Sequence, residues 1–343
     1  MRCPECNHNH KYKEGRICGK CGYRFVFNPK TDILYDGIIR QMIRRLSDND
    51  QHYFTSTPLA IEICQYSKKE ESRRTPVAVY IALVILIICL LTELWFIGVI
   101  IFAVAIISIK VDAAAQKVSG SFTQTASNSF TQAESAIQRY HKDYPIKQLV
   151  DGKAFVKTPV IGLSTADDVF APERILVVEH DDMVDMLIRN RFHQNTKTVV
   201  VSQTGYPNFV FTACQTFLTE NPKIPVQILH DASSEGFEMR HRLCNDAKWQ
   251  FARDNFVDIG LSRDSFIADE KFLLPWVSES NQDVFFNENY HYQEMLAEGR
   301  KVPLDYTAPK PFLNALSAAV VSGALLLVAL EKLTEDNSYE DYG

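Results

Sequence analysis

An apolar block at residues 77–109 limits the possible folds of this chain more than any other feature. It is interrupted only by Thr92, Glu93, Gly98 and Ser108. A buried helix of a soluble domain rarely has an apolar surface all round, because one of its faces normally meets water. We therefore expect the block to lie in a membrane. The alternative is a helical hairpin wholly buried in a large soluble core.

A single straight helix over this block would be roughly 50 Å long, whereas the hydrocarbon core of a bilayer is about 30 Å thick. Glu93 stands at the middle of the block, and a carboxylate at the bilayer centre costs on the order of 3 kcal/mol. A turn at Thr92 and Glu93 in the far headgroups avoids that cost. Lysines and arginines flank the block on both sides. The prediction is a transmembrane hairpin over 75–111, with the soluble domains in the cytoplasm.

Four cysteines near the N-terminus form two Cys-x-x-Cys pairs, made by Cys3, Cys6, Cys18 and Cys21. Two pairs at this spacing supply the four thiolates of one tetrahedral Zn²⁺. Zinc binding also folds a segment that is too small to have a core of its own. We predict a zinc ribbon over residues 1–28 with a structural Zn²⁺, and expect His8 and His10 in the intervening loop to be solvated. The motif resembles the zinc ribbons with which prokaryotic proteins contact protein or nucleic acid.

Residues 29–70 have a helical pattern on both sides of a polar turn. The segment 36–46 is apolar on one face and carries Arg40, Arg44 and Arg45 on the other. A second helix is expected from about Pro58 to Tyr66. Two interpretations stay open for 29–70: a small winged-helix-like module, or two helices that simply pack together. The segment 112–160 is predicted to be a helical connector.

Short β-branched segments alternate with amphipathic helices over 165–310. The expected strands are 175–178, 198–201, 225–229 and 257–260, and the expected helices are 182–192, 208–218 and 237–251. This alternation predicts an α/β fold with a parallel sheet and helices on both faces. Sites in such sheets lie at the carboxyl ends of the strands.

Polar residues gather at those strand ends. Glu179 and His180 follow the first strand, and the segment 230–236 follows the third. Carboxylates at adjacent ends of parallel strands can converge on Mg²⁺. The pattern over 174–266 resembles a Toprim domain, and is most similar to the A subunit of topoisomerase VI and the related meiotic break-forming proteins. The features that carry the resemblance are Glu179, Gly205-Tyr206-Pro207, Asp231 to Gly236, and Ile259 to Ser262 followed by Asp264.

The resemblance implies that Glu179 acts as general acid or base and that Asp231 binds Mg²⁺. Ser233 departs from the pattern, because it stands where the family has a second aspartate. A neutral hydroxyl there weakens Mg²⁺ binding. Glu235 stands where the type IA topoisomerases have a glutamate and is expected to restore the number of anionic ligands.

Topoisomerase VI A also needs a nucleophilic tyrosine before its Toprim domain, and the segment 57–62 lacks the expected pair, with Ala60 and Ile61 in its place. We therefore expect hydrolysis by metal-activated water, which needs no tyrosine. The first functional hypothesis is a membrane-anchored, Mg²⁺-dependent nuclease or related phosphodiester enzyme acting on nucleic acid at the cytoplasmic face. The second is a catalytically degenerate membrane adaptor that binds DNA or partner proteins through its zinc ribbon and Toprim fold.

Composition and the C-terminus add two constraints. The formal net charge is −6, so any nucleic-acid contact must come from a local basic patch. The segment 311–343 begins with an uncharged apolar stretch and ends in an acidic tail. We expect this stretch to be a helix packed on the sheet, with a third membrane span as the alternative.

Overall fold

The computed structural model describes residues 2–11, 13, 15–28, 32–67, 121–155, 172–261, 274–275 and 300–326. The predicted membrane hairpin over 75–111 and the acidic tail lie outside these residues. Within them, no helix combines the length and the apolar character that crossing a bilayer requires.

The centre of the molecule is a four-stranded sheet in the order β2-β1-β3-β4. The strands are β1 Arg174–Val178, β2 Thr198–Ser202, β3 Val226–Leu229 and β4 Phe256–Asp258. Every neighbouring pair is parallel. The predicted parallel α/β sheet is therefore confirmed, and the loops that follow β1 and β3 leave from the same edge.

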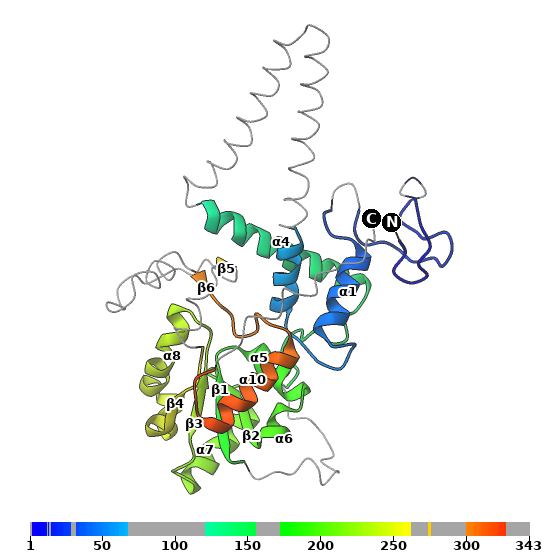
Figure 1. Cartoon of the computed structure of the whole chain (residues 1–343). Helices are drawn as coiled ribbons and strands as arrows, with labels where there is room; N and C mark the ends of the chain where they lie inside the picture. Colours follow the sequence, from blue (N-terminus) through cyan, green and yellow to red (C-terminus); the bar gives the residue numbers. More distant parts are fainter. Residues whose placement is uncertain are drawn as a thin grey trace, which may run out of the picture.

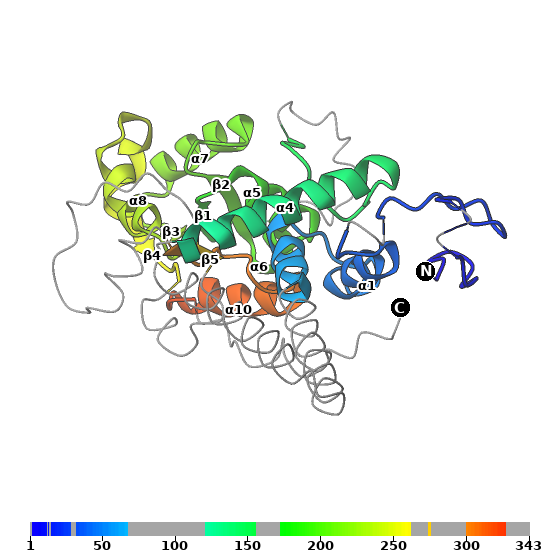
Figure 2. The same ribbon diagram turned by 90° about the horizontal axis from the view of Figure 1, so that it is seen from above.

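Side chains of β1 alternate between the two faces of the sheet and enter two different cores. Leu176 and Val178 pack with helices α5 Asp181–Arg189, α6 Phe192–Thr196 and α10 Pro309–Ser322. Ile175 and Val177 pack with α7 Asn208–Glu220, α8 Ser234–Asn245 and the 3-10 helix η3 Ala247–Asn255. Figure 2 shows α7 and α10 on opposite sides of the strands. Helices thus cover both faces, as the pattern of the sequence predicts.

The helices before the sheet share one of these cores. Helix α1 Asp36–Leu46, the helix at 56–67 and helix α4 Ser121–Asp143 pack around Met42, Leu59 and Ile137, and Figure 1 shows the three helices side by side above the sheet. The same core includes Leu176 and Val178. The described parts of the segments 29–70 and 112–160, namely 32–67 and 121–155, therefore pack as parts of one body with the sheet.

Two specific links fix this arrangement. The side-chain amide of Asn190, at the end of α5, accepts a hydrogen bond from Tyr53 N at 2.9 Å and donates one to Tyr53 O at 2.8 Å. Phe54 pairs with the segment at Leu149 through a parallel bridge. Within the described part of 29–70, α1 and the helix at 56–67 are present and no strand forms a wing.

The N-terminal segment is attached to α1 through Asp36. The buried carboxylate of Asp36 accepts hydrogen bonds from Tyr23 Oη at 3.0 Å, Val26 N at 2.8 Å and Phe27 N at 2.9 Å. Burial raises the pKa of Asp36, against the lowering effect of these donors. A single side chain at the start of α1 thus holds the end of the cysteine-containing segment.

The apolar stretch near the C-terminus forms α10, which begins at Pro309 and ends before Gly323 in the left-handed region, with φ of 69°. Its buried face contains Phe312, Leu316 and Val320. Gln227 of β3 donates a hydrogen bond to Val320 O at 2.8 Å. The described part of this stretch is therefore a helix packed on the sheet.

Candidate metal centres

The four N-terminal cysteines meet at one point. The Sγ atoms of Cys3 and Cys21 are 3.4 Å apart, and those of Cys6 and Cys18 are 3.7 Å apart. Four thiolates about 2.3 Å from a tetrahedral Zn²⁺ have sulfur atoms roughly 3.8 Å apart. The cluster therefore has the dimensions and the donor set of a structural zinc site.

The two Cys-x-x-Cys turns have the same backbone pattern. Cys3 N donates to His8 O at 2.9 Å, and Cys18 N donates to Tyr23 O at 2.8 Å. In both turns the N–H of the first cysteine thus bonds to the carbonyl group five residues later. Burial acts to raise the pKa of the Cys18 thiol, but hydrogen bonds from the backbone of Cys21 and Lys20 lower it to about 6. The fold thus favours the thiolate that a metal requires at Cys18.

The expectation for the two loop histidines is half right. His8 is exposed, whereas His10 is fully buried. The ring of His10 stacks on Phe25 with centroids 5.3 Å apart, and its Nε2 lies 2.8 Å from Gly15 O. The prediction of a solvated His10 is wrong, because the aromatic stack and this polar contact compensate the imidazole for the loss of water.

A second cluster lies where β1 and β3 end. Its members are Glu179, His180 and Asp231, whose candidate ligand atoms all lie within 4.8 Å of one another. Glu179 Oε2 accepts a hydrogen bond from Asp231 N at 2.8 Å. His180 Nε2 is 3.1 Å from Asp231 Oδ2. The two carboxylates that the sequence predicts at neighbouring strand ends do come together, and His180 joins them.

Both carboxylates of this cluster are buried while the imidazole reaches the surface. Glu179 is 5% exposed and Asp231 is 1% exposed, whereas the side chain of His180 is 44% exposed. Removing a carboxylate from water costs several kcal/mol unless cations or hydrogen bonds compensate it. The site is therefore a pair of buried carboxyl groups beside a histidine that reaches solvent.

The segment that follows β6 Arg300–Lys301 lies against Asp231. Val302 forms an antiparallel bridge with Ala232 through two hydrogen bonds of 3.0 Å. Leu304 N then donates to Asp231 Oδ1 at 2.9 Å. Sequence reasoning missed this segment, because nothing in its composition marks it as a neighbour of β3. Its effect is to fix one carboxylate oxygen of Asp231.

An ion pair between the buried His230 and the half-buried Asp258 supports the loop that follows β3. His230 Nε2 lies 3.1 Å from Asp258 Oδ1, at the end of β4, and His230 Nδ1 lies 2.7 Å from Asp231 O. Burial acts to lower the pKa of His230, but the hydrogen bonds and the charge of Asp258 outweigh it and raise that pKa. Gly236 lies so close that a Cβ there would overlap Asp231 O. The peptide after β3 is therefore held by the contact with His230 and by the close approach of Gly236.

The two other residues predicted for this site have separate positions. Ser233 is the N-cap of α8, and its Oγ accepts a hydrogen bond from Gly236 N at 2.9 Å. Glu235 is exposed in the first turn of α8 and is not a member of the cluster of Glu179, His180 and Asp231. The structure therefore brings together two of the three carboxylates that the sequence predicted as ligands.

Three cationic side chains contact residues that follow β1 and β2. Gln203 connects Arg242 to this edge, because it accepts a hydrogen bond from Arg242 Nη2 at 3.2 Å and donates one to Glu179 O at 3.0 Å. Lys153 forms an ion pair with Asp181, and Lys248 donates to Thr204 O. Lysine and arginine are the side chains that most often contact phosphate groups.

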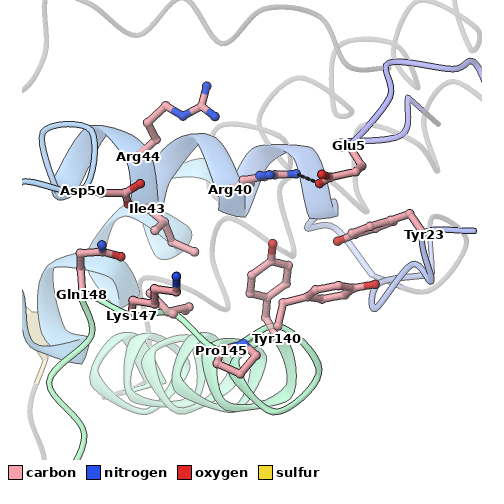
Figure 3. A pocket seen from close by; sticks show the side chains of 12 residues that line it. Glu5, Tyr23, Arg40, Ile43, Arg44, Asp50, Tyr140, Pro145, Lys147 and Gln148 are labelled. Carbon is pink, nitrogen blue, oxygen red and sulfur yellow. Dashed lines mark hydrogen bonds and ion pairs between the residues drawn. The ribbon is translucent and has the colours of Figure 1, made fainter. Parts of the chain in front are cut away.

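A separate pocket of about 330 Å³ lies between the cysteine segment, α1 and α4. Figure 3 shows its side chains, with Arg40 pointing toward Glu5, to which it is ion-paired at 2.6 Å. The lining combines cations with aromatic rings: Arg40, Arg44, Lys147, Tyr23, Tyr140 and Tyr144. These are the side-chain types that contact phosphates and bases. Arg45, the third arginine of α1, is paired with Glu62 at 2.7 Å.

Comparison with known proteins agrees with the geometry at the sheet edge. Neither the curated proteins nor the solved structures contain a significant match to this chain. Residues 174–245 match the family model of the Toprim domain of the topoisomerase 6 A-subunit/Spo11 type. The match covers β1 to α8 and includes Glu179 and Asp231, while the expected feature at Ile259 to Asp264 lies beyond it. The fold and this match together support a Toprim-type domain in this part of the chain.

Proposed function

We propose that this chain is a metal-dependent enzyme that cleaves phosphodiester bonds in nucleic acid. We further propose that the segment 75–111 anchors it to the cytoplasmic face of a membrane. The observation that carries the proposal is the pair of buried carboxylates, Glu179 and Asp231, at the ends of neighbouring parallel strands. A divalent cation bound between them would compensate both carboxylates for their burial.

The match at 174–245 supports the same chemistry, and the residues present fit a divalent cation because Glu179, His180 and Asp231 offer oxygen and nitrogen donors within one coordination sphere. A divalent cation bound here supplies an activated water and neutralises charge on the phosphate. Asp231, fixed by Leu304 N, is the ligand whose position the fold controls most closely. Glu179 would accept a proton from the attacking water. Lys153, Arg242 and Lys248 orient the nucleic-acid backbone.

The experiment is a plasmid-cleavage assay on the purified full-length chain with Mg²⁺ or Mn²⁺. We expect Asp231→Asn to abolish both metal binding and cleavage. Glu179→Gln is expected to lower turnover by roughly 10²-fold or more and to retain much of the metal binding. Asp254→Asn, at an exposed carboxylate outside the cluster, is the matched control and is expected to cleave at the wild-type rate. Cleavage that survives Asp231→Asn would place the activity in another protein or another site.

Glu235→Gln tests the third carboxylate that the sequence predicts as a ligand. Glu235 lies exposed in the first turn of α8, directly after the loop that carries Asp231. Its side chain would therefore have to move before it could act as a metal ligand. A loss of metal affinity in this variant would support such a role. Unchanged affinity and cleavage would leave Glu179 and Asp231 as the carboxylate ligands.

The adaptor hypothesis is the second candidate, and Ser233 is the observation that favours it. A hydroxyl that caps α8 gives the site less negative charge than a second aspartate would. On this hypothesis the cysteine segment and the pocket of Figure 3 bind DNA or a partner protein. It predicts DNA retention in a gel-shift assay without metal-dependent cleavage. Retention that is lost on Arg44→Ala and Lys147→Ala, but unaffected by Asp231→Asn, would favour the adaptor.

A further inference from the structure

We propose that His180 is a direct metal ligand, and that the site therefore selects a first-row transition-metal ion such as Mn²⁺ over Mg²⁺. This inference rests on the proposed metal-dependent function and concerns which ion that function uses. Neither the Toprim pattern nor the reasoning from the sequence assigns a role to His180.

The separation between the two candidate ligand atoms carries the inference. His180 Nε2 and Asp231 Oδ2 are 3.1 Å apart. Two neighbouring ligands about 2.1 Å from an octahedral ion are roughly 3.0 Å from each other. The imidazole and the carboxylate therefore already stand at the spacing of two adjacent ligands. Glu179 lies within the same 4.8 Å cluster and completes a set of three protein donors.

Ser233 does not supply a competing third ligand from the loop after β3. Its Oγ accepts a hydrogen bond from Gly236 N at 2.9 Å and so caps α8. Turning this hydroxyl toward the cluster would uncap the helix, at a cost of about 1 kcal/mol. His180 lies on the other loop, and its side chain caps no helix.

The kind of donor decides which ion the site prefers. Mg²⁺ binds oxygen ligands and water and retains its own hydration shell. Imidazole is a ligand for first-row transition metals, and their affinity for nitrogen donors exceeds that of Mg²⁺. Two carboxylates with one imidazole give a mixed oxygen and nitrogen set, which Mn²⁺ accepts and Mg²⁺ does not favour. Binding through Nε2 requires the tautomer in which the proton sits on Nδ1.

A purely orienting role for His180 makes a different prediction. In that role the imidazole donates to Asp231 Oδ2 and never contacts the ion. Its removal then lowers the affinities for Mn²⁺ and Mg²⁺ by the same factor. If His180 is a ligand, its removal lowers the affinity for Mn²⁺ more than that for Mg²⁺. In the wild type a nitrogen nucleus then lies next to the bound Mn²⁺. The ratio of the two affinities and the magnetic signature of the nitrogen therefore separate the two roles.

The experiment measures Mn²⁺ and Mg²⁺ binding to the zinc-loaded full-length chain by calorimetry, together with pulsed electron paramagnetic resonance of the Mn²⁺ complex. We expect the wild type to bind Mn²⁺ at least tenfold more tightly than Mg²⁺ and to show coupling to an imidazole ¹⁴N. His180→Asn should lower the Mn²⁺ affinity by about tenfold or more, remove that coupling and change Mg²⁺ affinity by less than threefold. His180→Asp should narrow or reverse the preference. His241→Asn, at an exposed histidine outside the cluster, should match the wild type in every measurement.

Two outcomes would overturn the inference. The absence of ¹⁴N coupling in the wild type would assign His180 an orienting role and leave Glu179 and Asp231 as the metal site. An equal loss of affinity for Mn²⁺ and Mg²⁺ in His180→Asn would lead to the same conclusion. If no divalent ion binds the wild type, or if Asp231→Asn binds Mn²⁺ as the wild type does, the proposed function itself fails. The failure of the inference and the failure of the proposed function are thus distinguishable.

Discussion

The hydroxyl of Thr55 donates a hydrogen bond to Asp305 Oδ2, although the two residues are 250 positions apart in the chain. Leu304, the residue before Asp305, donates its backbone N–H to Asp231 Oδ1 at 2.9 Å. Thr55 immediately precedes the helix at 56–67, which leads along the chain toward the apolar block. One dipeptide thus connects the candidate metal site with the beginning of that helix.

The first prediction concerns the pH dependence of stability that Asp305 creates. Burial, aided by the charges of Asp182 and Asp231, raises the pKa of Asp305 to about 7, against the lowering effect of the Thr55 hydrogen bond. In an unfolded chain an aspartate has a pKa of about 3.9. Between these values the folded state holds a proton that the unfolded state has lost, so the free energy of unfolding falls as pH rises through this window and is constant above it.

Asp305→Asn should remove this dependence, because an amide keeps an acceptor for Thr55 without a charge. The variant should gain roughly 1–3 kcal/mol of stability relative to the wild type between pH 5 and pH 8. Urea unfolding of both proteins at the two pH values measures the difference. In Thr55→Val the fall in the free energy of unfolding between pH 5 and pH 8 should be larger than in the wild type. In Thr55→Ser this fall should be the same as in the wild type. If the free energy of unfolding changes with pH in the same way in the wild type and in Asp305→Asn, the raised pKa of Asp305 is contradicted.

The sequence predicted the sheet because its signals are local. The β-branched segments that form β1 and β2 are continuous in the chain, and Glu179 and Asp231 follow directly after β1 and β3. The start of α8 was misjudged, because the apolar pattern begins at Phe237 whereas the helix begins at Ser234, after the Ser233 cap. The cap was the local signal that could have corrected it.

Contacts that depend on the tertiary fold could not be predicted from local patterns. The bond from Leu304 to Asp231 joins residues 73 positions apart, and no periodicity marks it. The burial of His10 depends on a stack with Phe25 across the cysteine loops. His180 had no recognised role, because one histidine after a strand is a weak signal until its distance to Asp231 is known.

The second prediction concerns the close approach at Gly236. A Cβ at this position would overlap Asp231 O and lie 2.9 Å from His230 Nδ1. Because that oxygen belongs to the backbone, Gly236→Ala must displace the peptide that positions the Asp231 carboxylate. We expect a loss of about 1–3 kcal/mol of stability together with at least a tenfold loss of Mn²⁺ affinity. Ser234→Ala in the same turn adds no volume and serves as the control, measured by thermal unfolding and calorimetry.

The third prediction concerns the four-cysteine cluster. Cys18→Ser removes one thiolate of a closed set, so zinc content should fall from one per chain to well below one. Cys244→Ser, at a cysteine outside the cluster, should retain its zinc. Because protons compete with the metal for the thiolates, zinc should be retained at neutral pH and released on acidification. Metal analysis after dialysis at pH 7.5 and pH 5 tests both statements, and full zinc retention by Cys18→Ser would refute the site.

The last prediction concerns the number of times the apolar block crosses a membrane. Ile63 of the helix before the block and Ile137 of α4, which follows it, belong to the same hydrophobic core, and Figure 1 shows both helices on the same body as the sheet. The two ends of a block that crosses a bilayer once lie on opposite sides, where they cannot share a core. A block that enters the membrane must therefore cross it an even number of times or turn back within it. Reporter fusions after Arg74 and Lys117 should both report the cytoplasm, and a fusion after Glu93 should report the far side or fail to report. Opposite compartments for Arg74 and Lys117 would refute both the hairpin and the shared core.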